Sequence, residues 1–195
     1  MDKKEITAFF DSLAESWDAE MIKSQWKIDK ILKVAGVTEG ISVLDVACGT
    51  GVLVPDYIDR KIGSYVGIDI SHNMVKIAEG KFAEHENLSF ICGDAEVHKF
   101  SEAFDCIVIY NALPHFPNPV LLFENLKQHL KEKGRITIAH GMSREALIKH
   151  HSGRAKPFST ILPEIDDLKG IMQPYFNIDV CVSDDEIYII SGTRA

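Results

Sequence analysis

The sequence predicts an α/β protein with a mostly parallel, seven-stranded sheet, helices on both faces and an antiparallel C-terminal hairpin. Five short apolar runs between residues 41 and 140 alternate with segments that carry apolar residues at helical spacing. Strands connected in this way run parallel and are covered on both faces. Two further apolar runs, 176–182 and 186–191, are joined by the short polar turn 183–185, which indicates a hairpin.

Residues 1–40 are expected to form a helical cap that precedes the sheet. Apolar residues recur at helical spacing from Phe9 to Trp17 and again from Ile28 to Ala35, and Gly36 fits a helix end. The aromatic side chains either pack in the core or line a binding site. Trp17 is our candidate for the substrate side.

Residues 41–140 are expected to form the ligand-binding core. Its helices are predicted to begin near Gly51, at the N-cap Ser71 and at Pro119, and Lys133–Gly134 is predicted to be a turn. Ligands in such sheets bind at the carboxyl ends of the strands, beside the first strand. The five strands are expected at 41–46, 65–70, 88–92, 104–110 and 135–140.

Residues 141–195 are expected to form a substrate-side segment followed by the hairpin. A helix is predicted from about Ser143, a loop over 152–163 and a short helix over 165–172. Together with the cap and the core, this makes a single domain of 195 residues, a length that suits one hydrophobic core.

Charge and cysteine usage limit the classes of partner. The net charge of −8 would repel a phosphate backbone, so we expect no nucleic acid. No apolar run approaches a membrane span, and no apolar leader follows Met1. The four cysteines form no Cys-x-x-Cys pair, which is typical of reduced thiols. We therefore expect a cytoplasmic protein that binds no nucleic acid and no membrane; a homodimer is left open.

A glycine turn after the first strand and an acid after the second predict a nucleoside site. Gly49 permits a close backbone approach, and Asp69 can accept hydrogen bonds from two ribose hydroxyls. Val54 occupies the place where a dinucleotide fingerprint requires a third small residue. Asp45 would repel a pyrophosphate but would suit an ammonium group. The pattern therefore favours a cationic nucleoside over NAD.

Residues 43–51 resemble motif I of the class I S-adenosylmethionine-dependent methyltransferases, which have a Rossmann-like fold. The resemblance covers about residues 40–140: residues 93–96, 104–116 and 130–136 resemble the motifs at the third, fourth and fifth strands. Residues 9–18 resemble the start of many small-molecule members. The motif that begins at Asn111 lacks the Pro-Pro-Tyr of DNA and protein amino methyltransferases. The resemblance implies S-adenosylmethionine as cofactor, S-adenosylhomocysteine as product, and a small-molecule acceptor methylated at O, N, S or C.

The same resemblance implies the cofactor-binding residues. The turn at 47–51 would hold the methionine part with Asp45 near its ammonium, Asp69 the ribose, residues 70–96 the adenine, and Asn111 would face the sulfonium. The residues so implied are Asp45, Ala47, Cys48, Gly49, Gly51, Asp69, Ile70, Met74, Asp94, Ala95, Glu96 and Asn111.

The catalytic residues are less determined, because a base is needed only when the nucleophile starts out protonated. His115, His140 and His151 are candidates for a base or for substrate orientation, and less so for a metal site, since their spacing matches no metal motif. Capping or surface roles are the alternative. Phe116 and Arg144 join Trp17 as substrate-side candidates. Two other functions stay open: a non-catalytic cofactor-binding module or complex subunit, and an NAD-dependent oxidoreductase.

Overall fold

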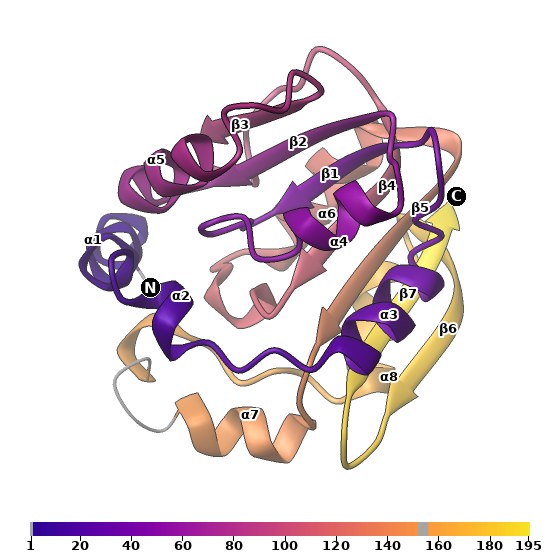
Figure 1. Ribbon diagram of the computed structural model, residues 1–195. Helices are drawn as coiled ribbons and strands as arrows, with labels where there is room; N and C mark the ends of the chain where they lie inside the picture. Colours follow the sequence, from indigo (N-terminus) through magenta and orange to yellow (C-terminus); the bar gives the residue numbers. More distant parts are fainter. Residues whose placement is uncertain (1, 152–155) are drawn as a thin grey trace.

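The computed structural model describes residues 2–151 and 156–195, and for His151 the backbone alone. One seven-stranded sheet runs through the molecule in the order β3-β2-β1-β4-β5-β7-β6 (Figure 1). The first five strands pair in parallel, and β7 pairs antiparallel with both β5 and β6. The predicted α/β class and sheet are therefore confirmed. The strands are β1 (Ser42–Val46), β2 (Ser64–Asp69), β3 (Leu88–Cys92), β4 (Phe104–Tyr110), β5 (Leu130–His140), β6 (Phe176–Ser183) and β7 (Tyr188–Arg194).

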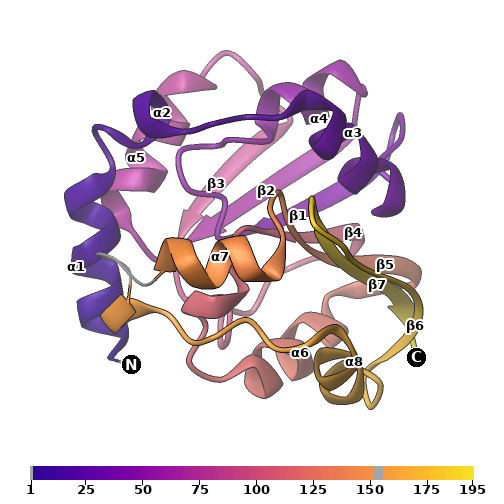
Figure 2. The ribbon, with the colours of Figure 1, turned by 90° about the horizontal axis from the view of Figure 1, so that it is seen from below.

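Helices cover both faces of the sheet because its central strands are apolar on both faces. Val43 and Leu44 on β1 are both fully buried, and as neighbours on a strand they point to opposite faces. Val43 belongs to the cluster that includes Tyr57, and Leu44 to the cluster that includes Leu122. Figure 2 shows α3 (Gln25–Val34) and α4 (Val54–Asp59) on one side of the sheet, with α6 (Pro119–Gln128) and α8 (Ile165–Met172) on the other.

The carboxyl ends of β1 and β4 form the switch point of the sheet. The chain passes from β1 to β2 and β3 on one side and then to β4 and β5 on the other, which leaves a crevice at these ends. Ala47 and Asn111, which directly follow β1 and β4, have left-handed backbones with φ of 57° and 54°. Such conformations cost energy in residues other than glycine and gather at functional sites.

Two N-terminal helices, α1 (Lys3–Leu13) and α2 (Trp17–Glu20), lie across these strand ends (Figure 1). Polar side chains attach them to the sheet. Asp11 accepts a hydrogen bond from the Ser71 hydroxyl, which also caps α5 (His72–Lys81), at an Oδ1–Oγ distance of 2.6 Å. Asp18 contacts the Thr50 hydroxyl at 2.5 Å and the Lys81 ammonium at 2.7 Å.

The structure differs from the predicted elements mainly in β5. The predicted turn at Lys133–Gly134 is wrong, because these residues lie within the strand. Leu130 pairs with Phe104 and Arg135 with Cys106, so residues 131–134 lie opposite a single residue of β4. The extra residues are accommodated as an irregularity of the strand rather than as a turn.

Other boundaries differ as well, among them the last strand, predicted over 186–191 and observed at Tyr188–Arg194. The helix predicted from about Gly51 begins at Val54. Within the predicted loop, residues 156–158 form a short 3-10 turn, η2 (Lys156–Phe158), which follows α7 (Arg144–His151), while residues 152–155 lie outside the described part. None of the helices in the described ranges is long and apolar enough to cross a membrane.

Candidate active site

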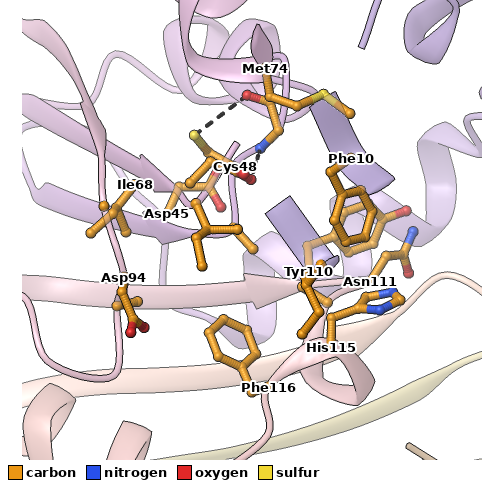
Figure 3. Close-up of a pocket in the computed structure, with 18 of the residues that line it drawn as sticks. Phe10, Asp45, Cys48, Ile68, Met74, Asp94, Tyr110, Asn111, His115 and Phe116 are labelled. Carbon is orange, nitrogen blue, oxygen red and sulfur yellow. Dashed lines mark hydrogen bonds between the residues drawn. The ribbon is translucent and has the colours of Figure 1, made fainter. Parts of the chain in front are cut away.

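A pocket opens at the carboxyl ends of β1, β2 and β4, beneath α1 and α2 (Figure 3). It holds about 1090 Å³ of space that is continuous with the solvent at its mouth. Most of the residues predicted from the sequence line it. These are Asp45, Ala47, Cys48, Gly49, Asp69, Ile70, Met74, Asp94, Ala95, Glu96 and Asn111, with Trp17, Phe116 and His115.

Asp45 is a buried acid in the wall of this pocket. Only 2% of its surface is exposed, and its Oδ2 accepts a 3.3 Å hydrogen bond from the Tyr65 hydroxyl. Burial raises the pKa of Asp45 to about 8, and the nearby Asp69 carboxylate adds to this effect. A carboxyl group held in this way is best compensated by a cation, so this part of the pocket suits a positively charged ligand group.

Asp69 stands at the end of β2 and joins two loops. Its Oδ2 accepts from the Gly49 N–H and its Oδ1 from the Ser71 N–H, both at 2.9 Å. Burial raises the pKa of Asp69, although these backbone hydrogen bonds oppose the rise. Each carboxylate oxygen has two lone pairs, so Asp69 can still accept hydrogen bonds from a ligand such as a ribose.

A second acidic pair, Asp94 and Glu96, lies in the loop after β3. Lys3 of α1 forms ion pairs with both carboxylates, each at an N–O distance of 2.5 Å. Partial burial lowers the pKa of Lys3, but its hydrogen bonds to the two acids raise it more, so the net shift is upward. One ammonium therefore meets two carboxylates, and this end of the pocket carries no unbalanced positive charge.

The opposite end of the pocket is aromatic. Figure 3 shows Phe10, Tyr110, Asn111 and His115 together at this end, and Asp94 with Ile68 at the other. Phe10 packs edge-on against Trp17, with ring centroids 5.9 Å apart, and against His115 at 5.0 Å. The pocket thus has a polar, acidic end and an end rich in aromatic rings.

His115 is held in one tautomer by the chain of η2. Its Nδ1 lies 2.7 Å from the Phe158 carbonyl oxygen, which can only accept, so Nδ1 carries the proton. In the neutral ring the lone pair is then on Nε2. Burial lowers the pKa of His115 more than the hydrogen bond to Phe158 raises it. The imidazole is therefore neutral near pH 7 and able to take up a proton.

Three of the predicted site residues lie away from the pocket. Gly51 (φ 80°) packs against Phe82, and a Cβ there would come within 2.6 Å of that ring, so its role is in the turn. His140 is fully buried and packs edge-on against Tyr188, with ring centroids 6.0 Å apart. It lies away from the pocket because β5 is two strands away from β1. Arg144 forms an ion pair with Glu164 at 2.9 Å.

The side chain of His151 lies outside the described part of the chain. Among the residues that the structure describes, no three His, Cys, Asp or Glu side chains are grouped so that they could hold a metal ion.

Several lining residues were missed from the sequence. Lys3 gave no signal, since one lysine in a charged N-terminus resembles any solvated residue. Tyr110 and Ile68 were assigned to strands. The alternation of side chains along a strand does not by itself show which of them face the pocket at the strand end. The lining residues absent from the predicted set are Lys3, Ile6, Phe10, Met21, Val52, Leu53, Ile68, Gly93, Tyr110, Ala112 and Pro117.

Comparison with known proteins places this site in context. Residues 43–134 match the family model described as "Methyltransferase domain". A curated relative, malonyl-[acyl-carrier protein] O-methyltransferase 2 of Ilyobacter polytropus, is 28% identical over 138 residues, which cover 70% of this chain. The chain spans only 53% of that relative's length.

Solved structures share the fold along nearly the whole chain. One is a chain of the complex between the Haloferax volcanii Trm112 methyltransferase activator and a methyltransferase, with a TM-score of 0.79, 20% identity and 95% and 97% of the two chains covered. Another is magnesium protoporphyrin IX methyltransferase from Synechocystis PCC 6803 with bound S-adenosylhomocysteine. Its TM-score is 0.75 at 18% identity, and both chains are fully covered.

Proposed function

We propose that the chain transfers a methyl group from S-adenosylmethionine to a small-molecule acceptor, and the match of residues 43–134 to the methyltransferase domain model supports this. The observation that carries the proposal is that three acids suited to three parts of one ligand line a single pocket. They are Asp45 within β1, Asp69 at the end of β2 and Asp94 in the loop after β3, and these three strands are neighbours in the sheet.

The residues present fit this cofactor. Asp45 is buried and accepts its hydrogen bond from the neutral Tyr65 hydroxyl, and the ammonium of the methionine part would provide a cationic partner. The backbone of Ala47, Cys48 and Gly49 would lie along the methionine part. Asp69 would accept hydrogen bonds from the ribose hydroxyls.

The remaining cofactor contacts lie toward the loop after β3. Ile70 and Met74 would pack against the adenine, and Asp94, Ala95 and Glu96 would border its polar edge. Asn111, held in a left-handed backbone at the end of β4, would face the sulfonium. Gly51 would act indirectly, by allowing the turn to form.

When bound, the cofactor supplies an electrophilic methyl group on a sulfonium, which is already a good leaving group. The protein then has to orient the acceptor, exclude water and receive a proton if the acceptor carries one. His115 is the residue we assign to the last task, because it lines the pocket as a neutral imidazole. His140 and Arg144 are not placed to contribute directly.

Calorimetry with S-adenosylmethionine and with NAD, on the wild type and on Asp69→Ala, tests this proposal. We expect binding of S-adenosylmethionine but not of NAD. Loss of charged hydrogen bonds, each contributing about 1.5–3 kcal/mol, should weaken binding at least tenfold in Asp69→Ala. Asp59→Ala, which changes an exposed acid outside the pocket, is the matched control and should bind as the wild type does.

Production of S-adenosylhomocysteine in a small-molecule cell extract separates an enzyme from a binding module. Binding without turnover in any extract would favour the non-catalytic module or complex subunit. Tight binding of NAD instead would favour the oxidoreductase and would contradict the proposal.

A further inference from the structure

We propose that the methyl acceptor is an uncharged aromatic molecule whose ring carries a hydroxyl or thiol group. This rests on the proposed function and specifies its substrate class. The acceptor end of the pocket is formed by Phe10, Trp17, Tyr110, His115 and Phe116.

The aromatic side chains of the acceptor end favour an aromatic ring. Phe10 stands edge-on to both Trp17 and His115, at interplanar angles of 75° and 86°, so the three rings form one aromatic wall that presents both ring faces and ring edges. Tyr110 and Phe116 come from β4 and from the segment after η1 (Leu113–His115), and both line the same pocket. Aromatic side chains bind aromatic ligands through edge-to-face and offset-stacked contacts that an aliphatic ligand cannot make.

The charges of the pocket exclude an anionic acceptor. Among the described residues that line it, Lys3 is the one lysine or arginine, and it is already shared between Asp94 and Glu96. Asp45 and Asp69 add further acidic groups. A carboxylate or phosphate acceptor would therefore meet no unpaired lysine or arginine in this lining, and its desolvation would be costly.

His115 and the sulfonium together favour a hydroxyl or thiol over an amine. An acceptor that loses a proton to Nε2 of His115 becomes an anion if it starts as a phenol or thiophenol. That anion is stabilised by the neighbouring imidazolium and sulfonium charges. A protonated amine would instead approach the sulfonium as a second cation.

The proposed transfer moves one proton and one methyl group. The acceptor O–H or S–H proton passes to Nε2 of His115. The acceptor oxygen or sulfur forms a bond to the methyl carbon, and the bond from that carbon to the sulfonium breaks with its electron pair staying on sulfur. The products are the methyl ether or thioether, S-adenosylhomocysteine and one proton, which His115 returns to solvent.

A matched set of one-ring probes tests the proposal: phenol, thiophenol, benzylamine, benzoate and the non-aromatic cyclohexanol. Methylated product is measured by mass spectrometry, and probe affinity by calorimetry with protein saturated with S-adenosylhomocysteine. We expect phenol or thiophenol to bind at least tenfold more tightly than benzoate or cyclohexanol and to be methylated faster than benzylamine. Preference for benzoate, benzylamine or cyclohexanol would overturn the proposal, and so would the absence of phenol and thiophenol binding.

Phe10→Leu tests the aromatic wall because it keeps an apolar side chain and removes the ring. We expect the dissociation constant of the preferred probe to rise about tenfold while that of S-adenosylhomocysteine stays within twofold. Trp26→Leu, an exposed aromatic outside the pocket, is the control and should change neither value. Unchanged probe binding in Phe10→Leu would refute the role of the wall. Failure of the protein to bind S-adenosylmethionine at all would refute the proposed function itself, which is a distinct result.

Discussion

Cofactor binding is expected to release a proton from Asp45. In the unliganded protein the pKa of this carboxyl is about 8, so roughly nine molecules in ten carry it protonated at pH 7. An ammonium group placed beside it selects the ionised form. The ligand ammonium has its own pKa of about 8 and must stay protonated. Affinity should therefore be highest near pH 8, where the two requirements are best met together.

The size of the pH effect on binding affinity follows from the ionisations of Asp45 and of the ligand ammonium. The fraction of pairs in the binding-competent state falls about 25-fold between pH 8 and pH 6, which is close to 2 kcal/mol of binding free energy. At pH 7 Asp45 releases about 0.9 proton and the ligand takes up about 0.1, so the net release is about 0.8 proton. Near pH 8 the two effects cancel and the net release approaches zero.

Isothermal calorimetry with S-adenosylhomocysteine measures both the pH dependence of the affinity and the number of protons released on binding. Dissociation constants are measured from pH 6 to pH 8.5, and titrations at pH 7 in buffers of different ionisation enthalpy give the number of protons released. Asp45→Asn should bind about tenfold more weakly at pH 8, since it loses a charged hydrogen bond, and should lose most of the weakening between pH 8 and pH 6. Methylthioadenosine, which keeps the adenine and ribose but lacks the ammonium, separates Asp45 from Asp69.

Two results would refute this reasoning. One is a dissociation constant for S-adenosylhomocysteine that changes less than threefold from pH 6 to pH 8. The other is an equally steep pH dependence in Asp45→Asn. Methylthioadenosine should bind the wild type and Asp45→Asn with the same pH dependence, and a difference between them would mean that Asp45 acts on the nucleoside part instead.

Three further outcomes are expected. Gly51→Ala should lower the free energy of unfolding by about 2–4 kcal/mol in denaturant titrations, because Gly51 has a left-handed backbone and an added Cβ would clash with Phe82. The control Gly80→Ala lies in open space on a helix and should raise the free energy of unfolding by up to about 1 kcal/mol. His115→Gln should reduce kcat about 10²–10⁴-fold and abolish the fall in rate at acid pH, while the affinity for S-adenosylhomocysteine stays within twofold; an unchanged pH–rate profile would remove His115 as the base. The raised pKa of Asp45 means that the folded state binds the extra proton, so the stability of the wild type relative to Asp45→Asn should fall as pH rises from about 4 to 8, by roughly 5 kcal/mol; equal slopes in the two proteins would contradict it.

The parts of the fold that follow local rules were predicted well from the sequence. Strands β3 (Leu88–Cys92) and β4 (Phe104–Tyr110) begin and end at the predicted residues, because their apolar runs are bounded by polar or turn residues. The N-cap at Ser71 is also confirmed, with its hydroxyl accepting from the Met74 N–H. Lys133–Gly134 was mistaken for a turn because the sequence does not show how β4 accommodates extra residues from its neighbour.

The two ends of the pocket differ in how far they could be predicted. The acidic end follows from motifs whose acids lie near the carboxyl ends of three strands: Asp45 within β1, Asp69 at the end of β2 and Asp94 shortly after β3. Position in the chain therefore determines position in space. The aromatic end depends on tertiary packing: Phe10 arrives from α1 and meets His115 from η1, more than a hundred residues later. His140 illustrates the same limit, because a place at a strand end does not say how far that strand lies from β1.

The attachment of α1 and α2 to the sheet has a consequence for how such a protein diversifies. Asp11 and Asp18 attach this segment to Ser71, Thr50 and Lys81 through polar contacts, while the strands of the sheet pair with one another and not with this segment. Phe10 and Trp17 are not among the buried core residues, so substitutions at these positions leave the packing of the apolar core unchanged. Under the proposed function, substitutions at Phe10 and Trp17 would change acceptor preference while Asp45 and Asp69, which lie on strands of the sheet, continue to bind the methyl donor.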